Sequence, residues 1–379
     1  MEKIAVNAGE AFKCLKAFSD QHRDWLFGHF SFDLKNEIES LSSKHPDHVG
    51  FPDLSFFVPE IVVELNDEKI IINSCQQDHA LILEDILRSS IEFTPSAKPT
   101  KILERFSKDE YLQTVETLRK HILLGDCYEI NFCQEFYAEE AGLDPLFLYQ
   151  SLSDASPMPF GAFYKSGNRY LLCASPERYL KKEGRTLRSE PIKGTEPRDL
   201  LNAELDIKHR EKLFQSSKDR SENIMVVDLV RNDLSKICEE GTVKVDELYG
   251  IYSFPQVHQM ISSVSGQIAA GIHWVDAIEA TFPMGSMTGA PKKKVLELIE
   301  RYEKTKRGLF SGAVGYLNPD GDFDFNVVIR SILYNRDNRY LSYQVGSGIT
   351  FYSDAEKEYE ECLLKASAIR NVLGKHQSF

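Results

Sequence analysis

The chain has 379 residues, with 58 acidic and 45 basic side chains and a formal net charge of −13. Sequence-independent binding of nucleic acid depends on neutralising phosphates with lysine and arginine, so this composition argues against a nucleic-acid partner. An anionic ligand needs a local positive site here, because the overall field of the protein repels it.

Cysteine usage and hydropathy indicate the compartment. Seven cysteines are scattered without Cys-x-x-Cys spacing, and an odd number of this kind is typical of reduced thiols. The stretch Met1–Ala5 shows no apolar signal, and no apolar run approaches the length of a membrane span. We therefore expect a cytoplasmic protein without membrane association.

The N-terminal part, residues 1–100, mixes short strand-like runs at 61–63 and 70–72 with helical pieces and carries no chemical motif. A linker-like stretch at 94–100 contains two prolines. We predict that residues 1–100 add strands and helices to the same fold as residues 101–379, which form the catalytic region.

Helix signals become clear after this stretch. Ser107 with Glu110 forms a capping-box pattern, and Gly125 suits the end of the helix that follows. Residues 203–237 read as one long or broken helix. Pro291 stands where a further helix begins.

Strand patterns separate these helices. Aromatic and β-branched runs fill 131–182 and 309–349, and the last helix is predicted to open at Ser353 with a second capping box to Glu356. The alternation is irregular and lacks βαβ units. We therefore predict an α+β fold whose antiparallel sheets form a sandwich-like core flanked by helices.

The last helix carries a polar stripe. Glu358, Glu361 and Lys365 stand at i, i+3 and i+7, so they share one face. Taken alone, such a stripe is usually a solvated surface. The stripe is a candidate site only if a second group of acidic side chains lies opposite to it.

Glu222 is the candidate for that second group. It lies in an apolar helix over 219–233, and a buried carboxylate needs a cation or hydrogen-bond donors. Glutamates from two helices, leaving positions for water and substrate oxygens, would suit Mg²⁺. Ion pairs with Arg220 and Arg231 are the alternative.

A second candidate pair is Glu177 and Lys193. Glu177 follows a strand-like run at 170–174, and Lys193 stands between Ile192 and a glycine. A lysine held among apolar groups can lose its proton and become a nucleophile, while a nearby glutamate can act as general acid. An ordinary ion pair, between the two or with a neighbouring residue, is the simpler interpretation.

Glycine-rich segments supply candidate anion sites. The segment 285–291, beginning at Gly285, runs into a helix whose N-terminus offers free N–H groups. Gly346 and Gly348 follow a strand and could form another N–H concavity. Arg330 could clamp a carboxylate. His258 stands alone in an apolar stretch, which is more typical of a core histidine.

These motifs in this order resemble the chorismate-binding enzyme family, which includes anthranilate, aminodeoxychorismate, isochorismate and salicylate synthases. The resemblance covers roughly residues 105–373. It rests on the following stretches: 175–178 (SPER), 191–195 (PIKGT), the Glu222 helix, 285–292, 311–316, 329–330, 346–348 (GSG) and the Glu358/Glu361 helix.

The resemblance implies a role for each candidate. Glu222 and Glu361 ligate magnesium, Glu358 assists through water, and Glu177 is the general acid on the departing ring hydroxyl of chorismate. The remaining positions bind substrate: Thr195, His258, Gly285, Thr288, Arg330, Gly346, Gly348 and Lys365.

Lys193 discriminates within the family. The motif P-I-K-G-T is similar to that of aminodeoxychorismate synthases, whereas anthranilate synthases carry alanine at the lysine position. The implied chemistry is attack of Lys193 on the ring as the hydroxyl leaves, followed by displacement of the lysine by ammonia to give 4-amino-4-deoxychorismate. Anthranilate synthase activity and a non-catalytic chorismate-binding homologue remain alternatives.

Two positions depart from the family pattern. Glu129 stands where many relatives carry glutamine and where isochorismate synthases carry a water-activating lysine, and Phe310 replaces a usual tyrosine. The chain also contains no Gly-x-Cys-x-Gly nucleophile elbow. We therefore expect ammonia to come from a separate glutamine amidotransferase subunit.

Overall fold

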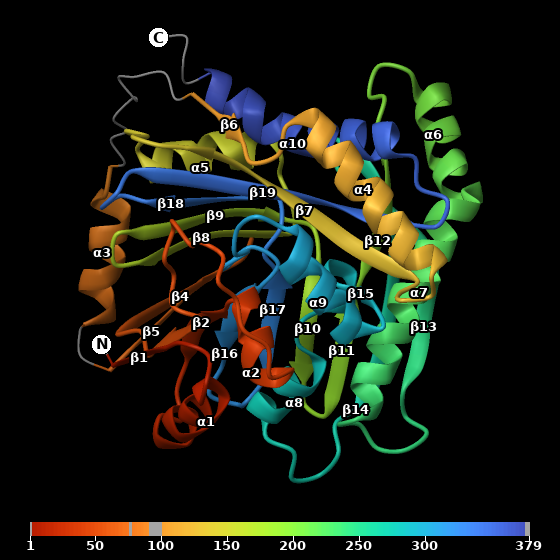
Figure 1. Ribbon diagram of the computed structural model, residues 1–379. Helices are drawn as coiled ribbons and strands as arrows, with labels where there is room; N and C mark the ends of the chain where they lie inside the picture. Colours follow the sequence, from red (N-terminus) through yellow and green to blue (C-terminus); the bar gives the residue numbers. More distant parts are fainter. Residues whose placement is uncertain (1, 76–77, 91–100, 376–379) are drawn as a thin grey trace.

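The computed structural model describes residues 2–75, 78–90 and 101–375. Two large β-sheets and one hairpin make up the β-structure, and helices cover the sheets from outside (Figure 1). Every strand pair within these described ranges is antiparallel. The predicted α+β class with antiparallel sheets is confirmed.

The larger sheet has ten strands. They are β1 Lys3–Val6, β2 Leu26–Phe30, β3 Leu54–Phe57, β10 Arg178–Glu183, β11 Thr186–Glu190, β12 Ile192–Pro197, β13 Lys244–Ser253, β14 Val257–Gln267, β16 Ala313–Leu317 and β17 Phe323–Val327. Their order is β1-β3-β2-β16-β17-β10-β11-β14-β12, with β13 also paired to β14. The N-terminal strands thus join strands from the far end of the chain.

The second sheet has seven strands. They are β6 Leu103–Glu104, β7 Glu129–Ala138, β8 Phe160–Ser166, β9 Arg169–Ser175, β15 Gly289–Ala290, β18 Ser331–Asn335 and β19 Tyr340–Thr350. Their order is β15-β7-β19-β18-β9-β8, with β6 also paired to β7. A separate hairpin joins β4 Ile61–Leu65 to β5 Ile70–Ser74.

Helices lie on the outer faces of the sheets. They are α1 Ala11–Gln21, α2 Lys35–Ile38, α3 His79–Arg88, α4 Lys108–Leu123, α5 Pro145–Ala155, α6 Ala203–Gln215, α7 Ser217–Ser235, α8 Trp274–Thr281, α9 Lys292–Tyr302 and α10 Ala355–Lys375. Helices α4, α5 and α10 cover the seven-stranded sheet, and α7 packs on β12 and β14 of the other sheet (Figure 1).

Strand β9 shows how the two cores are divided. Tyr170, Leu172 and Ala174 are buried in the core beneath α4, α5 and α10. Leu171 and Cys173 are buried in the other core, which includes residues of the ten-stranded sheet. Alternate residues of a strand point to opposite faces, so the sheet is covered on both sides.

Most helix predictions agree with the structure. The capping box of Ser107 and Glu110 opens α4, and the predicted helix over 203–237 is broken at Ser216 into α6 and α7. The predicted start of the last helix is wrong, because Asp354 accepts the hydrogen bond from Lys357 N. Ser353 instead accepts one from Thr350 N, within the preceding turn.

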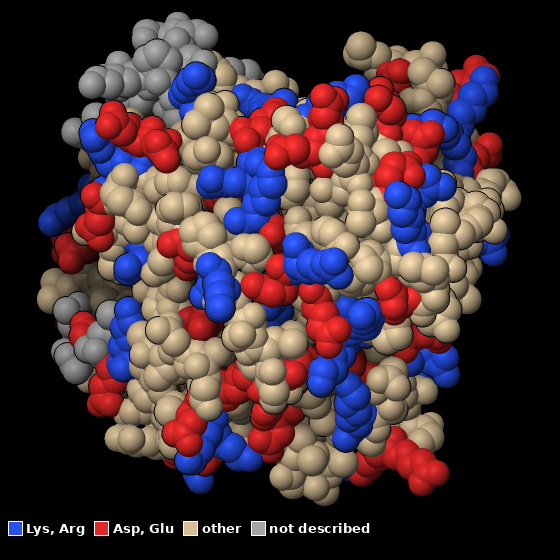
Figure 2. All heavy atoms as spheres, in the orientation of Figure 1, with Lys and Arg blue, Asp and Glu red and all other residues tan. Residues whose placement is uncertain are grey.

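Two further sequence expectations concern the chain as a whole. The linker-like stretch 94–100 lies outside the described residues. Within the described ranges, the helices are too short or too polar to span a bilayer. Lysine, arginine and acidic side chains are intermixed over the face shown in Figure 2, without a broad patch of one sign there.

Candidate active site

Three charged side chains converge on Gly348, near the end of β19. A Cβ built on this glycine would lie 2.9 Å from Glu129 Oε1, 3.0 Å from Lys193 Nζ and 3.4 Å from Glu222 Oε2. Glu129 opens β7, Lys193 lies in β12 and Glu222 lies in α7. The site therefore forms where the two sheets and α7 meet, and a side chain at 348 would push against the three charged groups.

Lys193 is ion-paired, as the simpler interpretation expected, but its partner is Glu129 rather than Glu177. Its Nζ donates to Glu129 Oε1 at 2.5 Å, with the two side chains 10% and 3% exposed. Burial acts to lower the pKa of this amine, but the carboxylates of Glu129, Glu222 and Glu177 outweigh it and raise the pKa above the usual lysine value. The amine rests as an ammonium ion.

Glu177 lies two residues beyond β9, as predicted, with its side chain fully buried. Burial raises the pKa of its carboxyl to about 7, against the opposing charges of Lys193 and Arg330. A carboxyl with this pKa keeps its proton in a large share of molecules at neutral pH. Glu177 can therefore donate a proton to a leaving group, as a general acid must.

Arg330 presents an uncommitted guanidinium near Glu177. Burial lowers the pKa of this group to about 10, although the charge of Glu177 acts in the opposite direction. Its backbone has a φ of +50°, which a non-glycine residue rarely adopts. Among the described residues, no hydrogen bond or ion pair engages the guanidinium, so it can receive a carboxylate.

The predicted acidic groups of α7 and α10 face each other across a lysine. Lys218 Nζ lies 3.1 Å from Glu358 Oε1, 3.8 Å from Glu222 Oε1 and 3.9 Å from Glu361 Oε2. Lys365 also pairs with Glu361 at 2.8 Å. The cation beside Glu222 is therefore Lys218, one helical turn away, and neither of the two arginines expected as alternatives.

The pKa values of Glu222 and Glu361 are shifted in opposite directions. Burial raises the pKa of Glu222 to about 7, with the Lys193 charge acting against it. Lys365, followed by Lys218, lowers the pKa of Glu361 to about 2 in spite of burial. Glu361 is thus the carboxylate most firmly ionised, while Glu222, whose Oε1 lies 3.8 Å from Lys218 Nζ, is held less firmly in its charged form.

The donor set fits a hard divalent cation chemically. Glu222 Oε1 and Glu358 Oε2 are buried without a hydrogen-bond partner, and such oxygens need a cation or donor. Carboxylate oxygens with room for water are the ligands that Mg²⁺ prefers. Within the described ranges, however, no three His, Cys, Asp or Glu side chains are already arranged around a common metal position. Lys218 lies between them instead.

Gly346 and Gly348 differ from their predicted place. Both lie inside β19, opposite Cys133 and Asn131 of β7, so the expected N–H concavity after a strand is wrong. The carbonyl of Gly346 accepts a hydrogen bond from Lys365 Nζ at 3.1 Å. This contact connects α10 to the strand that borders the Lys193 site.

The segment at Gly285 begins a short 3-10 helix, Gly285–Met287 (η2), followed by β15 before α9 starts. The Thr288 side chain is buried, and its hydroxyl donates a hydrogen bond to the Met284 carbonyl. The predicted helix does begin directly after this segment, since α9 starts at Lys292 with Pro291 as its N-cap residue.

Arg307 fixes this segment to β7. Its buried guanidinium donates to the carbonyls of Met287 and Asn131, and it pairs with Glu303 at 2.6 Å. Sequence reasoning missed both Arg307 and Lys218. The i, i+4 spacing of Lys218 and Glu222 was a usable signal, whereas the contacts of Arg307 cross distant parts of the chain.

His258 and Thr195 are not brought into the Lys193 cluster by any hydrogen bond among the described residues. His258 is buried between Asp206, at 3.0 Å from Nε2, and Ser253, at 2.8 Å from Nδ1. Thr195 is exposed in β12. The satisfied histidine matches the core interpretation better than the substrate-binding one.

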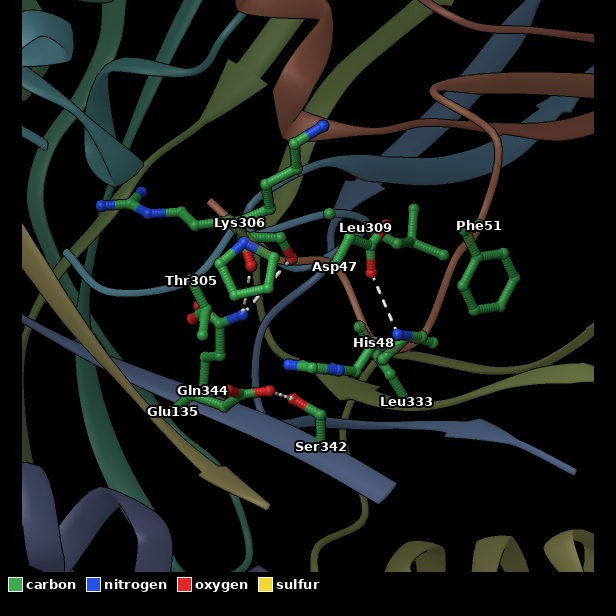
Figure 3. A pocket seen from close by; sticks show the side chains of 14 residues that line it. Asp47, His48, Phe51, Glu135, Thr305, Lys306, Leu309, Leu333, Ser342 and Gln344 are labelled. Atoms are coloured by element: carbon green, nitrogen blue, oxygen red, sulfur yellow. Dashed lines mark hydrogen bonds between the residues drawn. The ribbon is translucent and has the colours of Figure 1, made fainter. Parts of the chain in front are cut away.

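A small cavity lies apart from this site, beside Glu135 of β7 and the loop around His48 (Figure 3). It has room for about one water molecule. Ser342 Oγ donates to Glu135 Oε1 at 2.7 Å across its wall.

Comparisons with known proteins show the family to which the chain belongs. The family model described as "chorismate binding enzyme" matches residues 3–371. Aminodeoxychorismate synthase component 1 of Klebsiella aerogenes is 32% identical over 91% of this chain and 76% of that protein, and the protein of that name from Escherichia coli (strain K12) is 31% identical over 92% and 76%. The crystal structure of anthranilate synthase component I from Streptococcus pneumoniae TIGR4 superposes with a TM-score of 0.80 and 28% identity, covering 90% of this chain and 79% of that one.

Proposed function

The chain belongs to the chorismate-binding enzyme family, and we propose that it replaces a ring hydroxyl of chorismate with an amino group to give 4-amino-4-deoxychorismate. The observation that carries this proposal is the buried Lys193 amine beside the proton-bearing Glu177. A lysine at this position offers a nitrogen nucleophile. Anthranilate synthases carry alanine at the matching position and therefore lack this nucleophile.

The chemistry proceeds in two displacements. The neutral Lys193 amine attacks the ring carbon, the C–O bond breaks, and Glu177 gives its proton to the departing hydroxyl, which leaves as water. Ammonia then forms the new C–N bond as the bond to Lys193 breaks, and the Glu177 carboxylate takes the extra proton from the product ammonium. A covalent step of this kind divides one difficult displacement into two easier ones.

Two cationic groups would hold the carboxylates of chorismate. Arg330 is free to bind one of them through paired hydrogen bonds. Magnesium held by Glu222 and Glu361, with Glu358 assisting through water, would supply positive charge for the other. The buried oxygens of Glu222 and Glu358 that accept no hydrogen bond support this assignment. Lys218 must then move away from the glutamates.

Ammonia would come from a separate glutaminase subunit. The names of the relatives designate a component 1, and the sequence contains no nucleophile elbow of a glutamine amidotransferase. Ammonium added at high concentration should therefore replace the partner.

The test is to incubate the purified chain with chorismate, magnesium and ammonium and to identify the product by mass and by its conversion to p-aminobenzoate with an added lyase. The expected product is 4-amino-4-deoxychorismate, lost in Lys193→Ala and retained in Lys208→Ala, a control at an exposed lysine. Anthranilate, isochorismate or salicylate as the product would refute the proposal, as would undiminished turnover by Lys193→Ala.

A further inference from the structure

Glu129 is held rigidly against the nucleophile. It opens β7 and is paired on one side with Thr350 of β19 and on the other with Ala290 of β15. Its side chain is buried, and its carboxylate lies 2.5 Å from Lys193 Nζ. Because strands on both sides fix the backbone, the carboxylate has little freedom to leave the amine.

The amine faces an excess of negative charge. The charges of Glu129, Glu222 and Glu361 act on Lys193, as does the charge of Glu177 in the molecules in which it is ionised. These residues come from β7, α7, α10 and the turn after β9. An ammonium ion has no lone pair, so Lys193 must lose a proton before it can attack a carbon. The carboxylates that stabilise the resting ion therefore oppose its activation.

Only one of these carboxylates is placed to receive the proton. Among the described residues, Glu129 Oε1 is the single atom that accepts a hydrogen bond from Lys193 Nζ. Glu222 has its own ion pair with Lys218. Glu177 must keep its proton for the departing hydroxyl, so it cannot serve as the base in the same step.

We propose that Glu129 is the catalytic base of the reaction, an inference that rests on the proposed function. Glu129 takes a proton from the Lys193 ammonium ion when substrate fills the site, and it returns this proton after turnover. The Nζ–H bond breaks and the O–H bond of the Glu129 carboxyl forms, which leaves the nitrogen lone pair free to attack the ring. When ammonia has displaced Lys193 as a neutral amine, Glu129 gives the same proton back. No external base is needed, because Lys193 and Glu129 both return to their starting protonation states at the end of the cycle.

A glutamine at this position could accept the hydrogen bond but not the proton. Glu129→Gln is therefore the informative substitution, because it keeps size and hydrogen bonding and removes only basicity. We expect kcat at neutral pH to fall by about 10²- to 10⁴-fold, the range for loss of a general base. The defect should shrink as pH rises, since hydroxide then deprotonates Lys193 directly.

Glu135→Gln is the matched control. Glu135 lies in the same strand, is buried, and pairs with Arg105 at 2.8 Å. Its loss removes a buried ion pair without touching Lys193. Glu135→Gln should lower the thermal stability but leave the shape of the pH–rate profile unchanged. A defect of Glu129→Gln that is equal at all pH values, or a kcat within threefold of wild type, would overturn the proposal.

A second pair of variants covers the case in which Glu129→Gln does not fold. Glu129→Asp and Glu129→Asn have equal size, and only the first keeps a proton acceptor. Aspartate should retain at least tenfold more activity than asparagine at neutral pH, and equal activities would refute the base. Failure of the wild-type chain to aminate chorismate would instead refute the proposed function, so the two failures are distinguishable.

Discussion

Replacing Glu177 by glutamine should stabilise the folded protein at alkaline pH while abolishing most activity. Burial raises the pKa of this carboxyl from 4.5 to about 7, so the folded state binds the proton more tightly than the unfolded state does. Stability is then lost as pH rises from about 4.5 to about 7, because the folded state holds more protons over that range. Glutamine is neutral at every pH and avoids the cost.

The magnitude follows from the two pKa values. The difference between 4.5 and about 7, at about 1.4 kcal/mol per pH unit, corresponds to about 3 kcal/mol. The variant should therefore match the wild-type free energy of unfolding near pH 4.5 and exceed it by about 3 kcal/mol near pH 8. Its kcat should fall by about 10²- to 10⁴-fold, because glutamine cannot donate the proton.

Urea unfolding of both proteins at several pH values between 4.5 and 8 is the assay. Glu204→Gln, with an 82% exposed side chain, controls for the loss of one carboxylate. A Glu177→Gln variant whose stability relative to wild type does not change with pH would refute the raised pKa, and with it the role of Glu177 as general acid.

Variants at three other positions test the neighbouring groups. Glu361→Gln should lose magnesium-dependent activity, and an unchanged magnesium dependence would remove Glu361 from the proposed ligands. Lys218→Met should bind magnesium more tightly in calorimetry, because its ammonium lies 3.1 to 3.9 Å from the three glutamates; weaker binding would show that Lys218 assists the metal. Arg330→Ala should lower kcat/KM for chorismate by about 10- to 150-fold, as expected for a lost charged hydrogen bond of about 1.5–3 kcal/mol. Arg330→Lys should lower kcat/KM by less. An unchanged kcat/KM for Arg330→Ala would exclude the carboxylate clamp.

Local sequence signals gave the helices and strands, and they failed where a short helix interrupts a strand-rich stretch. Helix α5 was missed inside 131–182, although Asp144 before Pro145 marks its start and caps it in the structure. The N–H concavity expected at Gly346 and Gly348 was also wrong, because both glycines are paired with β7 inside β19. Packing of the glycines against β7 and the Lys193 site keeps that segment in the sheet.

The chemistry of the site depended on contacts that no spacing in the sequence reveals. The stripe of Glu358 and Glu361 was read correctly as facing Glu222, but the intervening Lys218 was not foreseen. Glu129 and Lys193 are 64 residues apart, and their pairing follows from sheet topology alone. The sequence indicated an ion pair at Lys193, but it did not reveal Glu129 as the partner.

Amination through Lys193 requires a covalent bond between its Nζ and the substrate ring. The most direct measurement is to mix the protein with chorismate and magnesium without ammonia, quench, and map the modified peptide by mass spectrometry. The account predicts an adduct of chorismate less one water on Lys193, which disappears when ammonium is added before the quench. Turnover to 4-amino-4-deoxychorismate with no adduct on Lys193 at any time would contradict it.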